Sequence, residues 1–66
     1  MLNMPEFYVI KENGVKDLFD YGKLENSLRK AGASEELIPE VVSEISKYAH
    51  EGITTHDIYN KAYSLA

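Results

Sequence analysis

Three lysines near the start of the chain could together bind an anion. Lys11 and Lys16 flank an Asn13-Gly14 pair between two β-prone runs. Asn-Gly supplies the two positive φ angles of a type I′ turn, so we expect a two-residue hairpin that sets Lys11 opposite Lys16. Like charges at opposed positions destabilise a sheet, and a bound anion would relieve that repulsion. Lys23 lies in the first turn of a predicted helix, where free backbone N–H groups also favour an anion, although solvation alone would satisfy all three lysines.

Candidates for catalysis or metal binding are few. The chain has two histidines and no cysteine, which excludes disulfides, thiolate metal sites and a cysteine nucleophile. His50-Glu51 and His56-Asp57 flank Gly52 at two predicted helix ends, without the repeat spacing that aims ligands at one metal. The sequence also lacks the phosphate-binding glycine loops and the nucleophile elbow of familiar enzymes. We therefore expect neither a metal site nor an enzyme.

The predicted elements form an α+β fold, in which an N-terminal β-hairpin packs on a small bundle of three helices. Residues 7–11 and 15–19 are the β-prone runs of the hairpin. The two-residue turn pairs Val9 with Leu18, and an isolated hairpin of this kind must pack on the helices to be stable. One face then carries Val9, Lys11, Lys16 and Leu18, and the other carries Tyr8, Ile10, Asp17 and Phe19.

Capping residues and apolar spacing predict the three helices. Asp20 caps the first helix, which runs to about residue 31. Ser34 caps the second helix, in which Pro39 either removes one hydrogen bond or marks a later start after a short turn. Thr54 opens the third helix through a variant of the capping box. The apolar positions with helical spacing are Leu24, Leu28, Ala31, Leu37, Ile38, Val41, Val42, Ile45, Tyr48, Ala49, Ile58, Ala62 and Leu65.

The composition is that of one small folded domain. The chain has 66 residues, of which 44% are hydrophobic and 27% charged, and its net charge is −4. The excess acid lies in residues 34–66, so the basic face that nucleic-acid binding requires is missing. No segment is apolar enough for a membrane span or a signal peptide, so we expect a cytoplasmic location. A winged-helix DNA-binding protein shares this element order, but its third helix would begin with Arg, Asn or Gln.

Four segments, in order, resemble the ATP-cone domain. Residues 9–14 (Val-Ile-Lys-Glu-Asn-Gly) and 19–24 (Phe-Asp-Tyr-Gly-Lys-Leu) are similar to the family motifs V-x-K-R-[DN]-G and [FI]-[DN]-x-x-K-[IL]. The segments Ala-Gly-Ala-Ser at 31–34 and Glu-Gly-Ile-Thr-Thr-His-Asp-Ile-Tyr at 51–59 match later parts of the family at fitting distances. The resemblance covers roughly residues 7–65. We expect residues 1–66 to be a single ATP-cone-like domain, as an N-terminal fragment or a truncated form that lacks the last family helix.

This resemblance implies a regulatory module that binds ATP or dATP, with Mg²⁺ carried by the nucleotide, and that does no chemistry itself. In the family, the identity of the nucleotide changes how the attached protein assembles. The expected partners are therefore a second copy of the chain, as a homodimer or oligomer, and a downstream reductase or nuclease-like domain. Direct contact with nucleic acid or with a membrane is not expected.

The resemblance also assigns ten nucleotide-binding residues. Lys11 and Lys23 match the family lysines that hold phosphates, and Asp17 and Asp20 match positions that hydrogen-bond the adenine edge. The other matches are the apolar pocket around the base (Val9, Phe19, Leu24 and Ile58), a hydroxyl near the nucleotide (Thr55) and an aromatic ring facing the phosphates or sugar (Tyr59).

Three departures from the family pattern favour weak or lost nucleotide binding. Glu12 replaces the usual arginine after Lys11, Asp17 is shorter than the frequent glutamate, and the closing helix is absent. The two-residue turn also puts Lys11 and Asp17 on opposite faces of the hairpin. If both residues contact one ligand, either the ligand lies across the end of the hairpin or the turn is wider than two residues. The alternative function is a degenerate ATP cone that docks another protein without nucleotide, through an exposed patch of Tyr48, Tyr59 and Tyr63.

Overall fold

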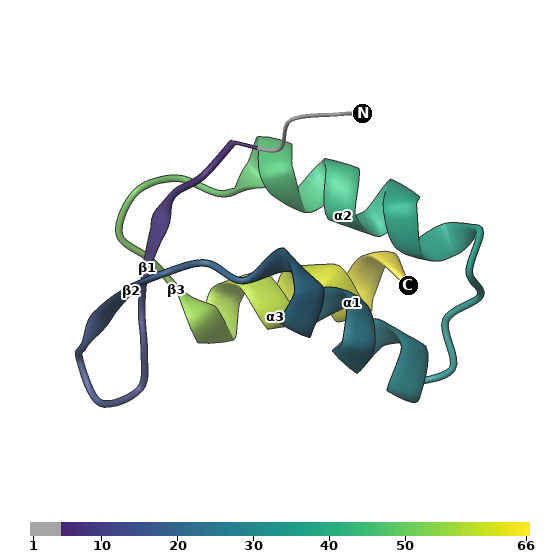
Figure 1. Cartoon of the computed structure of the whole chain (residues 1–66), viewed down its shortest axis with the longest axis horizontal. Helices are drawn as coiled ribbons and strands as arrows, with labels where there is room; N and C mark the ends of the chain where they lie inside the picture. Colours follow the sequence, from purple (N-terminus) through teal and green to yellow (C-terminus); the bar gives the residue numbers. More distant parts are fainter. Residues whose placement is uncertain (1–4) are drawn as a thin grey trace.

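The computed structural model describes residues 5–66, which form a three-stranded sheet and three helices (Figure 1). β1 (Tyr8–Ile10) pairs antiparallel with β2 (Lys16–Leu18), and β3 (Ile53–Thr54) pairs parallel with β1, which gives the order β2-β1-β3. The hairpin packs against the helices, so the predicted α+β class is confirmed. The sequence does not predict β3, because a strand of two residues carries no alternation pattern.

The hairpin turn is one residue wider than the sequence predicts. The N–H of Gly14 donates to the carbonyl oxygen of Lys11 (2.8 Å), and the N–H of Lys11 donates to the carbonyl oxygen of Val15 (2.9 Å). Gly14 has a φ of 81° whereas Asn13 has no positive φ, so the turn is a three-residue loop with a glycine bulge rather than a type I′ turn. The N–H of Val15 also donates to Asn13 Oδ1 (3.0 Å), which holds the asparagine in the loop.

The wider turn shifts the strand register by one residue. Val9 lies opposite Asp17 and Ile10 lies opposite Lys16, so the predicted opposition of Lys11 and Lys16 is wrong. Alternate residues of a strand share one face of the sheet, and the shift therefore moves Asp17 to the face that carries Val9 and Lys11. The prediction that Lys11 and Asp17 stand on opposite faces is wrong for the same reason.

Two of the three helices begin at their predicted capping residues. α1 (Tyr21–Lys30) follows Asp20, whose Oδ1 accepts a first-turn N–H at 3.2 Å. α3 (Thr55–Leu65) follows Thr54, whose Oγ1 accepts the N–H of Asp57 at 3.1 Å. Within residues 5–66, no helix has both the length and the apolar character that crossing a membrane requires.

α2 (Leu37–Tyr48) begins later than Ser34, its predicted cap. The N–H of Leu37 donates to both the hydroxyl (3.2 Å) and the carbonyl oxygen (3.0 Å) of Ser34, so Ser34 caps a turn that precedes the helix. Glu36 is the residue just before α2, and its side chain makes no capping hydrogen bond. Pro39 thus falls in the first helical turn, where its missing N–H breaks no helical hydrogen bond. Of the two alternatives that the sequence leaves open, the structure shows the second, in which the helix starts later, after a short turn.

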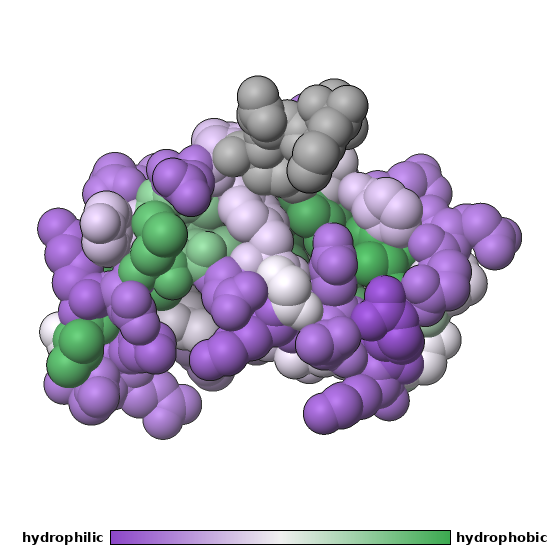
Figure 2. Space-filling view, viewed as in Figure 1, coloured by the Kyte–Doolittle hydropathy of each residue, from purple (hydrophilic) through white to green (hydrophobic). Residues whose placement is uncertain are grey.

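A continuous apolar core joins the helices to the inner face of the sheet. Leu24, Leu28, Ile45 and Ile58 are fully buried in it. Three positions that the helical pattern assigns to the core, Ala31, Tyr48 and Leu65, are exposed, because they lie at or just beyond the ends of their helices. On the face drawn in Figure 2, apolar surface emerges only in small areas between hydrophilic side chains. The other buried apolar residues are Phe7, Val9, Phe19, Ile38, Val41, Val42, Ile53 and Ala62.

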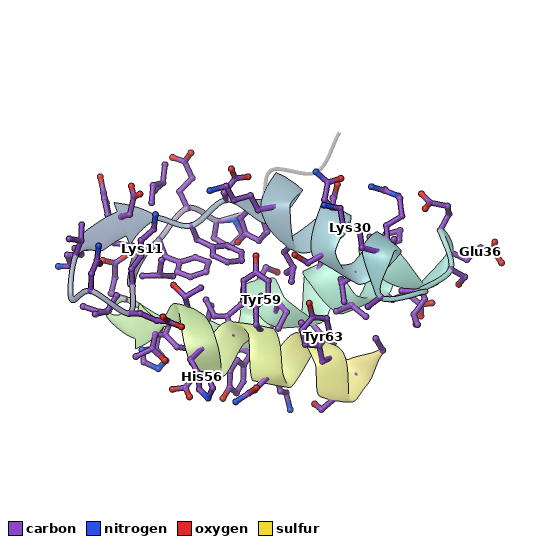
Figure 3. All side chains as sticks on the ribbon, turned by 90° about the horizontal axis from the view of Figure 1, so that it is seen from below. Lys11, Lys30, Glu36, His56, Tyr59 and Tyr63 are labelled. Carbon is purple, nitrogen blue, oxygen red and sulfur yellow. The ribbon has the colours of Figure 1, made fainter. Side chains whose placement is uncertain are left out.

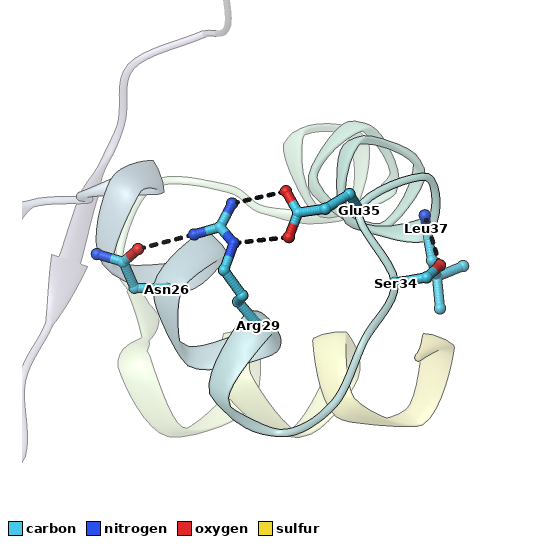
Figure 4. Close-up of polar contacts among 5 residues, drawn as sticks. All are labelled: Asn26, Arg29, Ser34, Glu35 and Leu37. Carbon is cyan, nitrogen blue, oxygen red and sulfur yellow. Dashed lines mark hydrogen bonds and ion pairs between the residues drawn. The ribbon is translucent and has the colours of Figure 1, made fainter.

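An ion pair outside the core ties the last turns of α1 to the loop before α2 (Figure 4). Arg29 donates from Nε (2.7 Å) and Nη2 (3.2 Å) to the two carboxylate oxygens of Glu35, and from Nη1 to Asn26 Oδ1 (2.9 Å). The hydrogen bonds from Arg29 lower the pKa of the Glu35 carboxyl, and Glu35 in turn raises the pKa of the guanidinium. This exposed pair connects α1 to the loop that precedes α2.

Candidate functional site

A hollow of about 250 Å³ opens where the inner face of the hairpin meets the first turns of α1 and α3. Its walls contain the two lysines and the two aspartates that the sequence analysis assigns to a ligand. The fold therefore brings residues of the hairpin and of the adjoining start of α1 together with residues of α3, which comes much later in the sequence. The lining residues are Val9, Lys11, Asp17, Leu18, Phe19, Asp20, Lys23, Thr55 and Tyr59.

Leu24 and Ile58 are the two predicted site residues that do not line the hollow. Both side chains are fully buried in the core. Val9 and Phe19 line the hollow while being only 3% and 8% exposed, so they belong to its floor and to the core at once. Leu18 lines the hollow without having been predicted, because no motif or apolar alternation in β2 singles it out.

Lys11 and Asp17 form an ion pair in the hollow, which the register shift makes possible. Lys11 Nζ lies 3.2 Å from Asp17 Oδ2, and Asp17 Oδ1 accepts the N–H of Leu18 at 2.9 Å. Both carboxylate oxygens are thus engaged. The hydrogen bond from Lys11 is the largest cause that lowers the pKa of the Asp17 carboxyl, followed by the Leu18 N–H, and the charge of Lys23 adds a smaller contribution.

Asp20 and Lys23 form the wall of the hollow that belongs to α1. One carboxylate oxygen of Asp20 accepts the N–H of Lys23 at 3.2 Å and so caps the helix. The hollow is lined by two lysines and two aspartates, whose formal charges cancel. An anion that enters would meet two cations, one of which, Lys11, already has a carboxylate partner.

A second hollow of about 360 Å³ shares Lys11, Thr55 and Tyr59 with the first. Glu12 and His56 complete its lining; Glu12 stands where the family motif has an arginine, and nothing in the sequence marks His56. Figure 3 shows Lys11 extending from the hairpin and Tyr59 projecting from α3 on the side of α1. Because three residues belong to both hollows, the two hollows adjoin each other.

The three tyrosines expected to form a protein-docking patch do not form one surface. Tyr59 and Tyr63 contact each other edge to face, with ring centroids 6.2 Å apart, and both project from α3 on the side of α1 (Figure 3). Tyr48 instead lies beneath Lys61, whose Nζ is 5.2 Å from the ring centroid. Lys61 and Tyr63 are separated by about 200° around the axis of α3. The two contacts are therefore on different flanks of the helix.

Each histidine contacts a residue that is close to it in the sequence. His50 Nδ1 lies 3.1 Å from the carbonyl oxygen of Glu51, and His56 Nε2 lies 2.9 Å from Asn60 Nδ2. Throughout the part of the chain that the structure describes, no three His, Cys, Asp or Glu side chains are placed to hold a metal ion together. Glu51, which follows His50, contacts the sheet instead: its Oε1 accepts the N–H of Tyr8, the first residue of β1, at 2.9 Å.

The two hollows offer complementary chemistry to a single ligand. The first has an apolar floor formed by Val9 and Phe19 and carboxylate acceptors beside it, which suits a flat ring with an amino edge. Lys11 and Lys23 suit anionic groups. The volumes are close to those of small-molecule sites, which begin at about 300 Å³. A purine nucleotide carries both kinds of group.

Comparison with known protein families points to the same class of ligand. The family model of the ATP cone domain matches residues 7–65, which is nearly the whole chain. ATP cones are regulatory nucleotide-binding domains rather than catalytic domains. No curated protein and no solved structure matches the chain.

Proposed function

The chain belongs to the ATP-cone family, and we propose that it binds ATP or dATP in the two hollows beside the hairpin. Binding there controls the activity or the assembly of an attached or partner protein. The observation that carries this proposal is the convergence of Lys11 and Lys23 on a hollow whose floor contains Val9 and Phe19. A nucleotide needs both features, because its base is flat and largely apolar and its phosphates are anionic.

The charged residues divide between the two ends of the nucleotide. Lys11 and Lys23 contact the phosphates, part of whose charge is balanced by Mg²⁺ that the nucleotide brings with it. Asp17 and Asp20 accept hydrogen bonds from the amino edge of adenine, since an ionised carboxylate is an acceptor only. This division uses every charged side chain that lines the first hollow.

The remaining predicted residues line the site from α3 or support it from behind. Thr55 and Tyr59 line both hollows, and we assign the hydroxyl to a position near the phosphates and the ring to the sugar or phosphates. Leu24 and Ile58 are fully buried, so their role is to support the floor of the site rather than to contact the base.

The position of the site between elements gives a bound nucleotide a way to regulate assembly. Residues of the hairpin, α1 and α3 line the hollows, so one ligand contacts all three elements and favours the arrangement that fits it. The expected result is nucleotide-dependent association, either between two copies of the chain or with a reductase or nuclease-like domain. The proposed setting is the cytoplasm, and the chain itself carries out no reaction.

Calorimetric titration with Mg-ATP and with dATP tests this function. We expect micromolar binding by the wild type and loss of binding in the double variant Lys11→Ala, Lys23→Ala. The matched control is Lys16→Ala, Lys30→Ala, which removes the same charge from two lysines outside the hollows. Equal loss of binding in both double variants would show that binding depends on net charge alone and not on the lysines of the hollow. Absence of heat at millimolar nucleotide with the wild type would overturn the proposal.

Protein docking without nucleotide is the second candidate function, and the position of Glu12 favours it. Glu12 lines the second hollow beside Lys11, where its carboxylate repels phosphate groups. Association of the chain that persists in nucleotide-free buffer, measured by analytical ultracentrifugation, would support docking. The variant Glu12→Arg separates the two functions, because ATP binding that arises only in that variant would show that the natural residue has abolished the site.

A further inference from the structure

The Lys11–Asp17 ion pair occupies two groups that a ligand in this site would use. Lys11 Nζ and Asp17 Oδ2 are 3.2 Å apart, and the other carboxylate oxygen of Asp17 holds the N–H of Leu18 at 2.9 Å. A ligand group that approaches Lys11 therefore meets a cation that is already neutralised. A ligand group that approaches Asp17 meets an acceptor that is already engaged. Binding at either residue requires the pair to separate or to share its partner.

The two members of the pair face different spaces. Asp17 lines only the first hollow, beside the apolar floor, whereas Lys11 lines both hollows. The Lys11 side chain is long, rotates freely and is 44% exposed, so it can turn toward the second hollow without a change in the backbone. Asp17 is short, and its hydrogen bond to Leu18 keeps it in the first hollow. The pair can therefore open in one direction, by movement of Lys11.

We propose that ligand binding exchanges this ion pair for two ligand contacts, and that Asp17 thereby selects ligands that carry both an amino edge and an anionic chain. In the exchange, Asp17 accepts a hydrogen bond from an amino group in the first hollow, and Lys11 contacts phosphate in the second hollow. The inference rests on the proposed nucleotide site and goes beyond it, because it gives Asp17 the role of rejecting bare polyanions.

A ligand with only one of the two groups leaves one charge of the opened pair without a partner. Inorganic tripolyphosphate can satisfy Lys11, but it brings its negative charge next to Asp17. Adenosine offers an amino group to Asp17, but it leaves Lys11 unpaired. Like charges brought together and polar groups left unpaired are the means by which a site rejects a competing ligand. An adenine nucleotide replaces both halves of the pair.

Titration of ATP, tripolyphosphate and adenosine into three proteins at constant ionic strength tests the exchange. The proteins are the wild type, Asp17→Asn and Asp57→Asn. In Asp17→Asn we expect tripolyphosphate to bind about tenfold more tightly than in the wild type, and the preference for ATP over tripolyphosphate to fall by a similar factor. Asp57→Asn removes the same charge from an exposed residue of α3 that lines neither hollow, and it leaves the ion pair intact. Its preference for ATP should stay close to that of the wild type.

The outcomes separate this inference from the proposed function. An unchanged preference in Asp17→Asn would overturn the inference, and so would an equal change in both variants, which would reduce the effect to net charge. Adding Lys11→Met to Asp17→Asn should abolish the gain in tripolyphosphate affinity, and a gain that survives would place the anion away from Lys11. If ATP fails to bind the wild type, the proposed function fails, while tighter tripolyphosphate binding by Asp17→Asn would still support the exchange. Circular dichroism spectra establish that each variant is folded.

Discussion

Between the helices, Leu24, Leu28 and Ile45 are completely buried, and no polar side chain among the described residues is buried with them. At the hairpin end, by contrast, Lys11 and Asp17 face each other with 44% and 56% of their side chains exposed. The first region draws its free energy from apolar area removed from water, which salt and pH change little. The second holds charges in partial contact with water, where each pair adds little stability. Stability and the proposed ligand recognition therefore rest largely on different residues, and Val9 and Phe19 are shared between them.

The inner face of the hairpin contains the boundary between these two regions. Phe7 and Phe19 stack at the end near the helices, with ring centroids 5.1 Å apart, and both are buried. Toward the turn, the same face carries Lys11 and Asp17. A single strand thus contributes to the core at one end and to the site at the other, so substitutions along it separate the two functions.

Truncation in the helical region should produce the largest effect. Leu28 is fully buried, and Leu28→Ala should cost about 2–5 kcal/mol of the free energy of unfolding. A domain of this length has about 3–10 kcal/mol in total, so a large part of the population should be unfolded. Urea unfolding followed by circular dichroism measures the change. Leu65→Ala is the matched control because Leu65 is 36% exposed. Equal losses of stability in both variants would contradict the conclusion that burial between the helices is the main source of stability.

Removal of a lysine from the site should change affinity without reducing stability. We expect Lys23→Ala to weaken ATP binding about tenfold, because a charge-assisted contact to phosphate is lost. Its urea midpoint should stay the same or rise slightly, since a cation near a helix N-terminus is unfavourable. Lys30→Ala is the control, because Lys30 lies on the same helix outside the hollows (Figure 3). Loss of stability in parallel with loss of affinity would contradict the division between the two regions.

Gly14 lies in the hairpin turn, and we expect its substitution to have an intermediate effect on stability. Gly14 has a φ of 81°, and nothing lies within 4 Å of the place where a Cβ would be added. Gly14→Ala should therefore cost about 1–2 kcal/mol through backbone strain alone. Gly14→Asn should cost less, because asparagine tolerates the left-handed region better. Urea unfolding of both variants checks this order, and equal stability of Gly14→Ala and the wild type would contradict the three-residue loop.

Acid should have the smallest effect on stability, and it should act on the exposed ion pairs. Arg29 holds the pKa of Glu35 below its ordinary 4.5, and Lys11 holds the pKa of Asp17 below its ordinary 3.8. A carboxyl with a lowered folded pKa contributes fully above its ordinary pKa and loses that contribution as the pH falls through the lowered value. The melting temperature should thus be level above about pH 5 and decline at lower pH.

Thermal melts of Glu35→Gln across the same pH series provide the matched comparison. This variant lacks the titrating carboxyl, so its melting temperature should decline less than that of the wild type on acidification. The difference should shrink in high salt, because the pair is exposed and salt screens it. A decline of the same size in both proteins would assign the acid sensitivity to other carboxyls.

Local signals in the sequence predicted the local features of the fold. Asp20 and Thr54 cap helices because an aspartate or threonine before an apolar-periodic run satisfies free N–H groups whatever lies around it. The turn is different, because Asn-Gly fits both a type I′ turn and a three-residue loop with glycine in the left-handed region. The adopted register stacks Phe7 on Phe19 inside the molecule. That gain comes from tertiary packing, which the dipeptide does not encode.

The candidate site was predictable only as far as its motif extends. The spacing of Lys11 and Lys23 marked both lysines, and the fold brings them to one hollow. Helical spacing could not separate the fully buried Leu24 and Ile58 from residues that line the hollow, because both kinds share the inward face. The family motif marks position 12, where Glu12 replaces an arginine, whereas His56 lines the second hollow with no signal in the sequence.

The direct junction of β3 with α3 makes the sheet and this helix one mechanical unit. Thr54 is at once the last residue of β3 and the cap of α3, so no flexible joint separates them. A helix of eleven residues is about 16 Å long, and a tilt of about 5° at its first turn displaces its last turn by about 1.4 Å. A small rotation at the sheet edge therefore becomes a larger displacement at Leu65. α3 thus has the geometry of a lever arm whose pivot lies beside the first hollow.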